Sequence, residues 1–182
     1  MKTGGARTTW LVAVGVAAAA TAVLVPLAGT KDVPTGLTYG PLSEPQGPHD
    51  RAVIARYRGT KAVDLGNARA LGEDDEGNSY LVVAADRSLC FVVIHSSEAM
   101  SGGCDPLDGA ARKPQWLEFG GRHGHRMAVL VPDEYRGAEN PAPGGVLLQE
   151  ENLIVLESTG DGSDTVRLVS DRHADLIVGP KS

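Results

Sequence analysis

Two apolar runs that lie three residues apart decide the fold of this chain: Tyr80-Leu-Val-Val-Ala-Ala85 and Leu89-Cys-Phe-Val-Val-Ile94. Both are rich in residues that favour strands, and neither alternates with polar residues, which is typical of strands buried on both faces. Asp86-Arg-Ser88 between them has the composition of a turn. The stretch therefore predicts a hairpin of two central strands.

Further short apolar runs follow this hairpin toward the C-terminus, with turn residues between them. They are Trp116–Phe119, Arg126–Val131, Val146–Gln149, Leu153–Leu156, Thr165–Val169 and Ala174–Val178. No strong helical pattern follows Leu71, which argues against alternating strands and helices. We therefore expect a mainly β (β-rich α+β) domain, an antiparallel sheet or sandwich of about seven or eight short strands with one disulfide.

Helical signals precede the hairpin. Pro48-His49-Asp50 predicts the start of a short helix over residues 50–57, with Asp50 as its N-cap. Val53, Ile54 and Tyr57 would share one face of it. Residues 64–71 form either a second short turn of helix or an extended arm.

The N-terminal segment from Thr8 to Thr30 carries no charged residue, whereas Lys2 and Arg7 precede it. About 20 apolar helical residues cross a hydrocarbon core of roughly 30 Å. Because positive charge stays on the cytoplasmic side, we expect one transmembrane signal-anchor over residues 10–28 with its N-terminus inside. The sequence thus predicts that the membrane is a partner and that the protein spans it once.

A cleaved signal peptide is the alternative, and it would give a secreted protein. The Ala-x-Ala candidates at Ala18–Ala20 and Ala20–Ala22 lie inside the apolar run instead of after it. Cleavage there would leave Val23 to Ala28 exposed at a new terminus, so the run favours an uncleaved anchor.

Composition divides the rest of the chain. Residues 1–9 are assigned to a cytoplasmic stub, and residues 29–48, which contain Pro34, Pro41, Pro45 and Pro48, to an extracytoplasmic linker. Residues 49–182 are assigned to the β-rich extracytoplasmic domain, a length that suits a single domain.

The charge balance excludes one class of partner. The chain has 17 basic and 23 acidic residues, and every acidic residue follows the apolar segment. Without Lys2 and Arg7, 15 basic residues face these 23 acidic ones, so the outer part is strongly acidic. We expect no nucleic-acid partner, because phosphate backbones need a basic surface.

Cys90 and Cys104 are the two cysteines of the chain, and both follow the apolar segment. In an oxidising compartment they should form a disulfide. Closing a loop of about 15 residues contributes roughly 3 kcal/mol to stability. Two unpaired buried thiols are the alternative.

One histidine pair suggests a metal site. In Gly121-Arg-His123-Gly-His125, an extended backbone would place both imidazoles on one side, as zinc and copper sites often require. His95 or Asp105 would have to supply a third ligand, and no regular spacing identifies it. The alternative is a polar, glycine-rich entry into the strand that follows.

Other site patterns are weaker. Residues 73–78 and 161–164 are acidic enough to attract calcium, but neither has the spacing of a calcium loop, and acidic turns are usually solvated. Ser96, Ser97 and Ser101 lie near His95, yet no nucleophile motif, phosphate-binding loop or dinucleotide fingerprint is present. We therefore assign no catalytic residue and expect no cofactor.

Four short motifs occur in order along the middle of the chain: Leu89-Cys90-Phe91, Gly102-Gly103-Cys104, Leu130-Val131-Pro132-Asp133 and Asn152-Leu153-Ile154. Their order resembles that in a loose group of small exported or membrane-anchored actinobacterial proteins, most of them uncharacterised. The resemblance covers about Ala68 to Glu157 and departs from the group's Val-Pro-Asp-Gly-Val pattern at Glu134-Tyr135. It implies a disulfide and a β-rich fold, and no activity.

These features favour a non-catalytic, membrane-anchored extracytoplasmic domain that serves as a binding or structural module of the bacterial cell envelope. Another envelope protein would be its partner. The alternative is a secreted metal-dependent hydrolase that uses His123 and His125.

Overall fold

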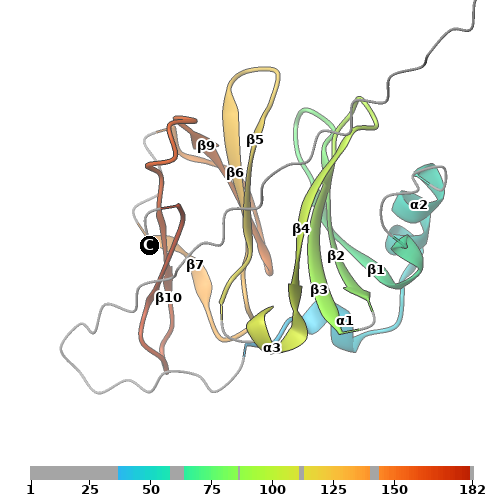
Figure 1. The fold of residues 1–182 in the computed structure, drawn as a ribbon, viewed down its shortest axis with the longest axis horizontal. Coiled ribbons are helices and arrows are strands. Elements are labelled where there is room, and N and C mark those ends of the chain that lie inside the picture. The colour runs from blue at the N-terminus through green and yellow to red at the C-terminus, as the bar shows by residue number, and fades with distance from the viewer. Residues whose placement is uncertain (1–36, 58–63, 86, 111–112, 140–143, 181–182) are drawn as a thin grey trace, which may run out of the picture.

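The computed structural model describes residues 37–57, 64–85, 87–110, 113–139 and 144–180. These residues contain eleven strands and a few short helices, and three antiparallel sheets stack as layers (Figure 1). The predicted β-rich, antiparallel architecture is therefore confirmed. The predicted stub, membrane segment and first part of the linker, residues 1–36, lie outside the described residues. No helix within the described ranges has the length and apolar character needed to span a bilayer.

The first sheet contains the predicted hairpin. Its strand order is β1-β2-β3-β4, formed by β1 (Ala68–Glu73), β2 (Ser79–Ala85), β3 (Ser88–Ile94) and β4 (Met100–Pro106). Leu81 pairs with Val92 and Val82 with Phe91 across the two central strands. All four of these side chains are at most 1% exposed, which confirms that the hairpin is buried on both faces.

The second sheet forms the middle layer. Its order is β5-β6-β9-β8, formed by β5 (Trp116–Gly120), β6 (His125–Leu130), β9 (Leu153–Ser158) and β8 (Val146–Glu150). Residues 127–130 of β6 and 153–156 of β9 are buried, because another sheet covers each face of this layer (Figure 1). A middle layer of this kind explains why both strands are continuously apolar.

The third sheet has the order β11-β10-β7, formed by β11 (Leu176–Val178), β10 (Val166–Val169) and β7 (Arg136–Glu139). Val166 and Leu168 belong to the same core cluster as the middle sheet and the inner face of the first sheet. The three layers therefore share one continuous core.

Helix α2 (Pro48–Arg56) covers the outer face of the first sheet (Figure 1). Val53 and Tyr57 pack there in a second apolar cluster, as predicted. The helix begins earlier than expected, and Asp50 is not its N-cap. The Asp50 carboxylate accepts hydrogen bonds from the backbone N–H groups of Gly47, at 2.6 Å, and Ala70, at 2.8 Å, so it joins the first turn of the helix to β1.

The remaining short elements are α1 (Gly40–Ser43), η1 (Leu65–Asn67) and α3 (Leu107–Ala110). Leu37 and Tyr39, just before α1, are buried in the main core. Gly40 N donates to Asp133 Oδ1 at 2.8 Å, and Thr38 Oγ1 donates to Glu134 Oε1 at 2.7 Å. Residues 37–48 are therefore part of the folded unit, and the assignment of all of residues 29–48 to a linker needs this correction.

The strand count exceeds the predicted seven or eight. Strands β4 and β7 were not expected, and β1 overlaps the segment for which a helical turn and an extended arm were both considered. Gly102, Gly103 and Pro106 give β4 the composition of a loop. The partner strand overrides this local preference, since β4 pairs with β3 over its whole length. Cys90 lies opposite Cys104 in that ladder, and the disulfide between them confirms the predicted pairing.

Candidate functional site

The most concentrated group of buried charged residues lies where β1 turns into β2. The Asp74 carboxylate shapes this turn, because its Oδ1 accepts from the backbone N–H groups of Glu76, at 3.0 Å, and Asn78, at 2.9 Å. Gly77 completes the turn with a φ of 77°, a left-handed conformation that glycine adopts without strain. The acidic run thus has a defined backbone conformation.

Arg126, the second residue of β6, brings the middle sheet to this turn. Its Nη1 lies 2.6 Å from Asp74 Oδ2 and 2.9 Å from Asp75 Oδ1, and its Nη2 lies 2.8 Å from Glu76 Oε1. The side chains of Arg126, Asp74 and Glu76 are each at most 4% exposed, whereas that of Asp75 is 71% exposed. We call these four residues the Arg126 cluster.

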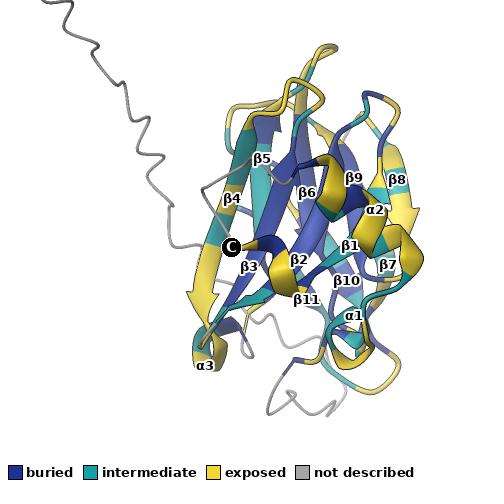
Figure 2. Cartoon of the chain, turned by 90° about the vertical axis from the view of Figure 1, so that its right-hand side faces the viewer, coloured by how far each residue is buried: buried dark blue, intermediate teal, exposed yellow. Residues whose placement is uncertain are grey.

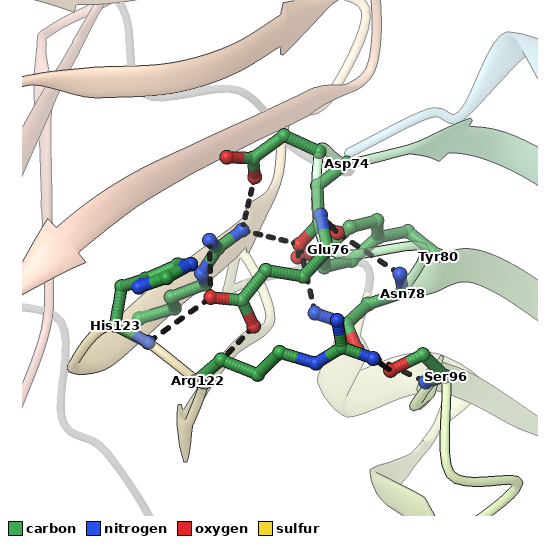
Figure 3. Close-up of polar contacts among 9 residues, drawn as sticks. Asp74, Glu76, Asn78, Tyr80, Ser96, Arg122 and His123 are labelled. Atoms are coloured by element: carbon green, nitrogen blue, oxygen red, sulfur yellow. Dashed lines mark hydrogen bonds and ion pairs between the residues drawn. The ribbon is translucent and has the colours of Figure 1, made fainter.

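Glu76 also fixes the loop between β5 and β6. It accepts from the backbone N–H groups of Arg122, at 2.8 Å, and His123, at 3.2 Å (Figure 3). Gly121 permits this approach, because a Cβ at this position would lie 2.8 Å from Glu76 Oε2 and 3.0 Å from Arg126 Nε. The cluster therefore joins a loop of the first sheet to a loop and a strand of the second.

Asp74 is surrounded by donors. Besides the two backbone N–H groups and Arg126, its Oδ2 accepts from Tyr80 Oη at 2.7 Å and from Asn78 Nδ2 at 2.9 Å. Asn78 continues the network, since its Oδ1 accepts from Ser96 N at 3.2 Å. Ser96 in turn lies 3.4 Å from the guanidinium of Arg122 (Figure 3).

These contacts set the protonation states. Burial raises the pKa of Asp74, but hydrogen bonds from Tyr80 and Asn78 and the charge of Arg126 outweigh it, so the net pKa lies below its usual value. Burial also raises the pKa of Glu76, and the Arg122 N–H and the Arg126 charge reverse that effect. Burial and the bond to Asp74 raise the pKa of Tyr80. The carboxylates therefore stay ionised and the tyrosine stays neutral.

The arrangement is suited to holding structure. A general acid or base needs a pKa near the working pH and a position open to substrate. The carboxylates of Asp74 and Glu76 have lowered pKa values instead, and their oxygens accept hydrogen bonds from other groups of the protein. In the interior the charge of Arg126 offsets part of the charge of Asp74 and Glu76, and the N–H and O–H groups that donate to the two carboxylates stabilise the rest. We therefore interpret the Arg126 cluster as a clamp between two sheets.

The two predicted metal ligands do not lie on one strand. His123 lies in the β5–β6 loop, His125 is the first residue of β6, and Gly124 between them has a φ of 143°, so the pair does not share the extended strand that the pattern required. The ring of His125 lies against Gly160.

The two proposed third ligands are also engaged elsewhere. His95 Nε2 lies 2.8 Å from Ser101 Oγ, and its ring meets the edge of Phe119 at a centroid distance of 5.2 Å. Asp105 accepts from Gln115 Nε2 at 3.2 Å. Asp105 pairs with Leu89 at one end of the first sheet and His95 follows β3 at the other, so they are about 20 Å apart at roughly 3.3 Å per residue. Within the described residues no group of three or more His, Cys, Asp or Glu side chains is placed to hold a metal ion.

The two acidic runs have structural partners. Residues 73–78 were expected to be solvated, but Asp74 and Glu76 are buried because they bind Arg126. In the second run, Asp164 Oδ2 accepts from Thr159 N at 2.7 Å and from Ser158 Oγ at 2.9 Å, and Asp161 Oδ1 accepts from Ser163 N at 2.8 Å. These carboxylates order the turn after β9.

A different surface combines exposure with apolar character. Strand β8 is the outer strand of the middle sheet, and its Val146 and Leu147 are each 40% exposed (Figure 2). Among the described residues the other large hydrophobic side chain in this class is Leu107 of α3, at 49%. Beyond the C-terminal end of β8, a cavity of about 290 Å³ is lined by residues that include Glu44, Arg69 and Glu151.

Sequence reasoning missed both features. Arg126 stood at the head of an apolar strand, and a charge there predicts a buried partner, but the partner could not be chosen among many acidic residues. The run of residues 146–149 predicted a strand, but strand order decides whether its side chains meet solvent.

Comparison of the chain with protein-family profiles, curated proteins and solved structures finds no match.

Proposed function

We propose that this protein is a non-catalytic, membrane-anchored domain outside the cytoplasm that binds another protein of the bacterial envelope. One observation carries the binding role: the outer strand β8 displays apolar side chains along an edge with which no other described strand pairs. The disulfide between Cys90 and Cys104 supports an oxidising compartment, because such bonds are rare in the cytosol. The uncharged run before residue 30 supplies the anchor in this proposal.

An open strand edge exposes a protein to unwanted pairing and aggregation. Its outward N–H and C=O groups can pair with any extended chain, and natural proteins blunt such edges with lysine, proline, a β-bulge or a covering element. Strand β8 has a bulge at Leu147 but no lysine or proline, it leaves Val146 and Leu147 exposed, and it pairs with β9 alone among the described strands. We infer that a partner covers this edge in the cell.

The binding role is tested in cells by photocrosslinking. A photoreactive amino acid replaces Leu147 in the full chain, and the control carries it at Leu107, which is at least as exposed but lies on α3 at the other side of the molecule (Figure 2). We expect a discrete protein adduct from position 147 and not from position 107.

Three results would contradict this proposal in different ways. No adduct at either position would remove the evidence for a binding edge, and equal adducts at both would show non-specific capture. Stoichiometric zinc in the purified chain that is lost in His123→Ala would support the hydrolase alternative instead.

A further inference from the structure

We propose that β8 binds an extended polypeptide segment that carries lysine or arginine, as an added strand, and that the cavity beyond Glu150 receives one of its basic side chains. This inference rests on the proposed binding role and adds the chemistry of the partner. It depends on three properties of the edge: its free backbone, its apolar side chains and its negative charge.

Pairing with β9 and packing against β1 hold the backbone of β8 in place. Gln149 pairs with Ile154 and Glu150 with Leu153 of the buried strand β9. Leu148 packs against β1, where a Cβ on Gly72 would lie 3.2 Å from its Cδ2 atom. A partner strand would therefore meet an ordered edge and lose little free energy to ordering β8 itself.

The apolar side chains lie at the N-terminal end of this edge. The register with β9 shifts between Val146 and Leu148, so Leu147 is the extra residue of a β-bulge. Val146 and Leu147 are each 40% exposed to solvent. An added strand with an apolar residue at this point would remove that area from water, which favours binding.

The C-terminal end of the edge is acidic. Glu150 and Glu151 are exposed there, and the adjoining cavity is lined by Glu44, Asp50 and Glu151 with Arg69 as its basic residue. The guanidinium of Arg69 is bound to the backbone carbonyl of Glu44, at 2.6 and 3.0 Å. Both oxygens of Asp50 accept backbone N–H bonds, but its charge adds to those of Glu44 and Glu151, so three acidic residues against one basic residue favour a cationic side chain in this cavity.

A second copy of this chain fits the edge less well. Antiparallel pairing of two β8 strands would bring a second acidic domain, with its own Glu150 and Glu151, onto a chain whose net charge is already −6. Like charges across an interface oppose association. Self-association through β8 is therefore an outcome that would overturn the proposal.

The test uses the full chain in detergent and a fluorescent peptide of sequence Lys-Val-Thr-Val-Thr-Val-Lys. Fluorescence anisotropy measures its affinity, and hydrogen–deuterium exchange maps where it binds. The first matched probe has glutamate in place of both lysines, and the second has proline in place of both threonines, which removes two backbone donors. We expect the lysine peptide to bind, each matched probe to bind at least about tenfold more weakly, and protection to appear at residues 145–150.

Substitutions in the protein show which part of the β8 edge contributes to the affinity for the peptide. Leu147→Lys should weaken binding of the lysine peptide about tenfold, whereas Leu107→Lys makes the same change on α3 and should have no effect. The double variant Glu44→Gln, Glu151→Gln should weaken it about threefold or more and reduce its salt dependence. Glu98→Gln in the β3–β4 turn is the matched control.

The outcomes separate the two proposals. No binding of the lysine peptide, equal binding of the glutamate peptide, protection away from β8, or concentration-dependent dimers broken by Leu147→Lys would each overturn the basic-strand inference. If a crosslinked partner still forms at position 147 in cells, the binding role stands and only the proposed partner chemistry is wrong. If neither peptide binding nor a crosslinked partner is observed, both proposals are wrong.

Discussion

Arg126 holds the β1–β2 turn against the middle sheet by compensating two buried carboxylates. Removing one partner of a buried ion pair leaves an uncompensated charge, which costs about 3–5 kcal/mol. We predict that Arg126→Met lowers the free energy of unfolding by that amount in urea denaturation. Arg136→Met, which breaks an ion pair with Asp171 between side chains that are 84% and 71% exposed, should cost less than about 1 kcal/mol.

The same account predicts a partial rescue. In the triple variant Arg126→Met, Asp74→Asn, Glu76→Gln, no unpaired charge remains at these three positions, so stability should recover by more than half of the loss. Equal losses for Arg126→Met and Arg136→Met would contradict the clamp.

Two adjacent glycines test the close approach of Glu76. A methyl group on Gly121 would meet Glu76 Oε2 and Arg126 Nε at 2.8 and 3.0 Å, whereas one on Gly120 would meet no atom within 4 Å. We predict that Gly121→Ala destabilises the protein by about 1–3 kcal/mol through overpacking, and that Gly120→Ala is neutral or slightly stabilising. Thermal unfolding of the two variants compares them directly, and similar melting temperatures would count against this packing.

Stability should fall at acid pH in two steps. Burial lowers the pKa of His95, so the unfolded chain takes up that proton first and stability begins to decline below about pH 6.5. The pKa values of Asp74 and Glu76 are also lowered, so their contribution is complete above about pH 5 and is lost as pH falls further. Urea midpoints across this range measure both steps, and His95→Gln should remove the first. A pH-independent midpoint would refute the assignment.

At the scale of elements, β4 depends on its covalent link to β3. Its sequence contains Gly102, Gly103 and Pro106, which are poor strand residues, so pairing and the Cys90–Cys104 bond hold it in place. We predict that Cys90→Ala, Cys104→Ala costs about 2–4 kcal/mol. Amide exchange should rise first in β4, and a uniform rise across all three sheets would contradict this local role.

The elements also show what the sequence could predict. Strands β2, β3, β6 and β9 were predictable because their apolar runs are buried on both faces, and α2 because its start signal is local. Strands β1 and β4 were not, because pairing with the neighbouring strand overrides their local composition. The acidic run was expected to be solvated, since nothing near it in the sequence shows that Arg126 lies 2.6 Å from Asp74.

At the largest scale, the described part of the chain is a stack of three sheets with α2 on its outer face (Figure 1). Its proposed location outside the cytoplasm is tested by labelling intact cells with a membrane-impermeant maleimide. We predict that Ser97→Cys, in the exposed β3–β4 turn, is labelled and that Thr3→Cys, before the uncharged run, is not. The reverse pattern would invert the topology.

Hydrogen–deuterium exchange shows whether a partner covers the β8 edge in the cell, when the full chain in its native membranes is compared with the same chain after purification in detergent. We predict that amides of residues 146–150 are protected in the membranes and exchange after purification, while the buried β9 stays protected in both. Equal exchange at residues 146–150 in the two preparations would contradict it.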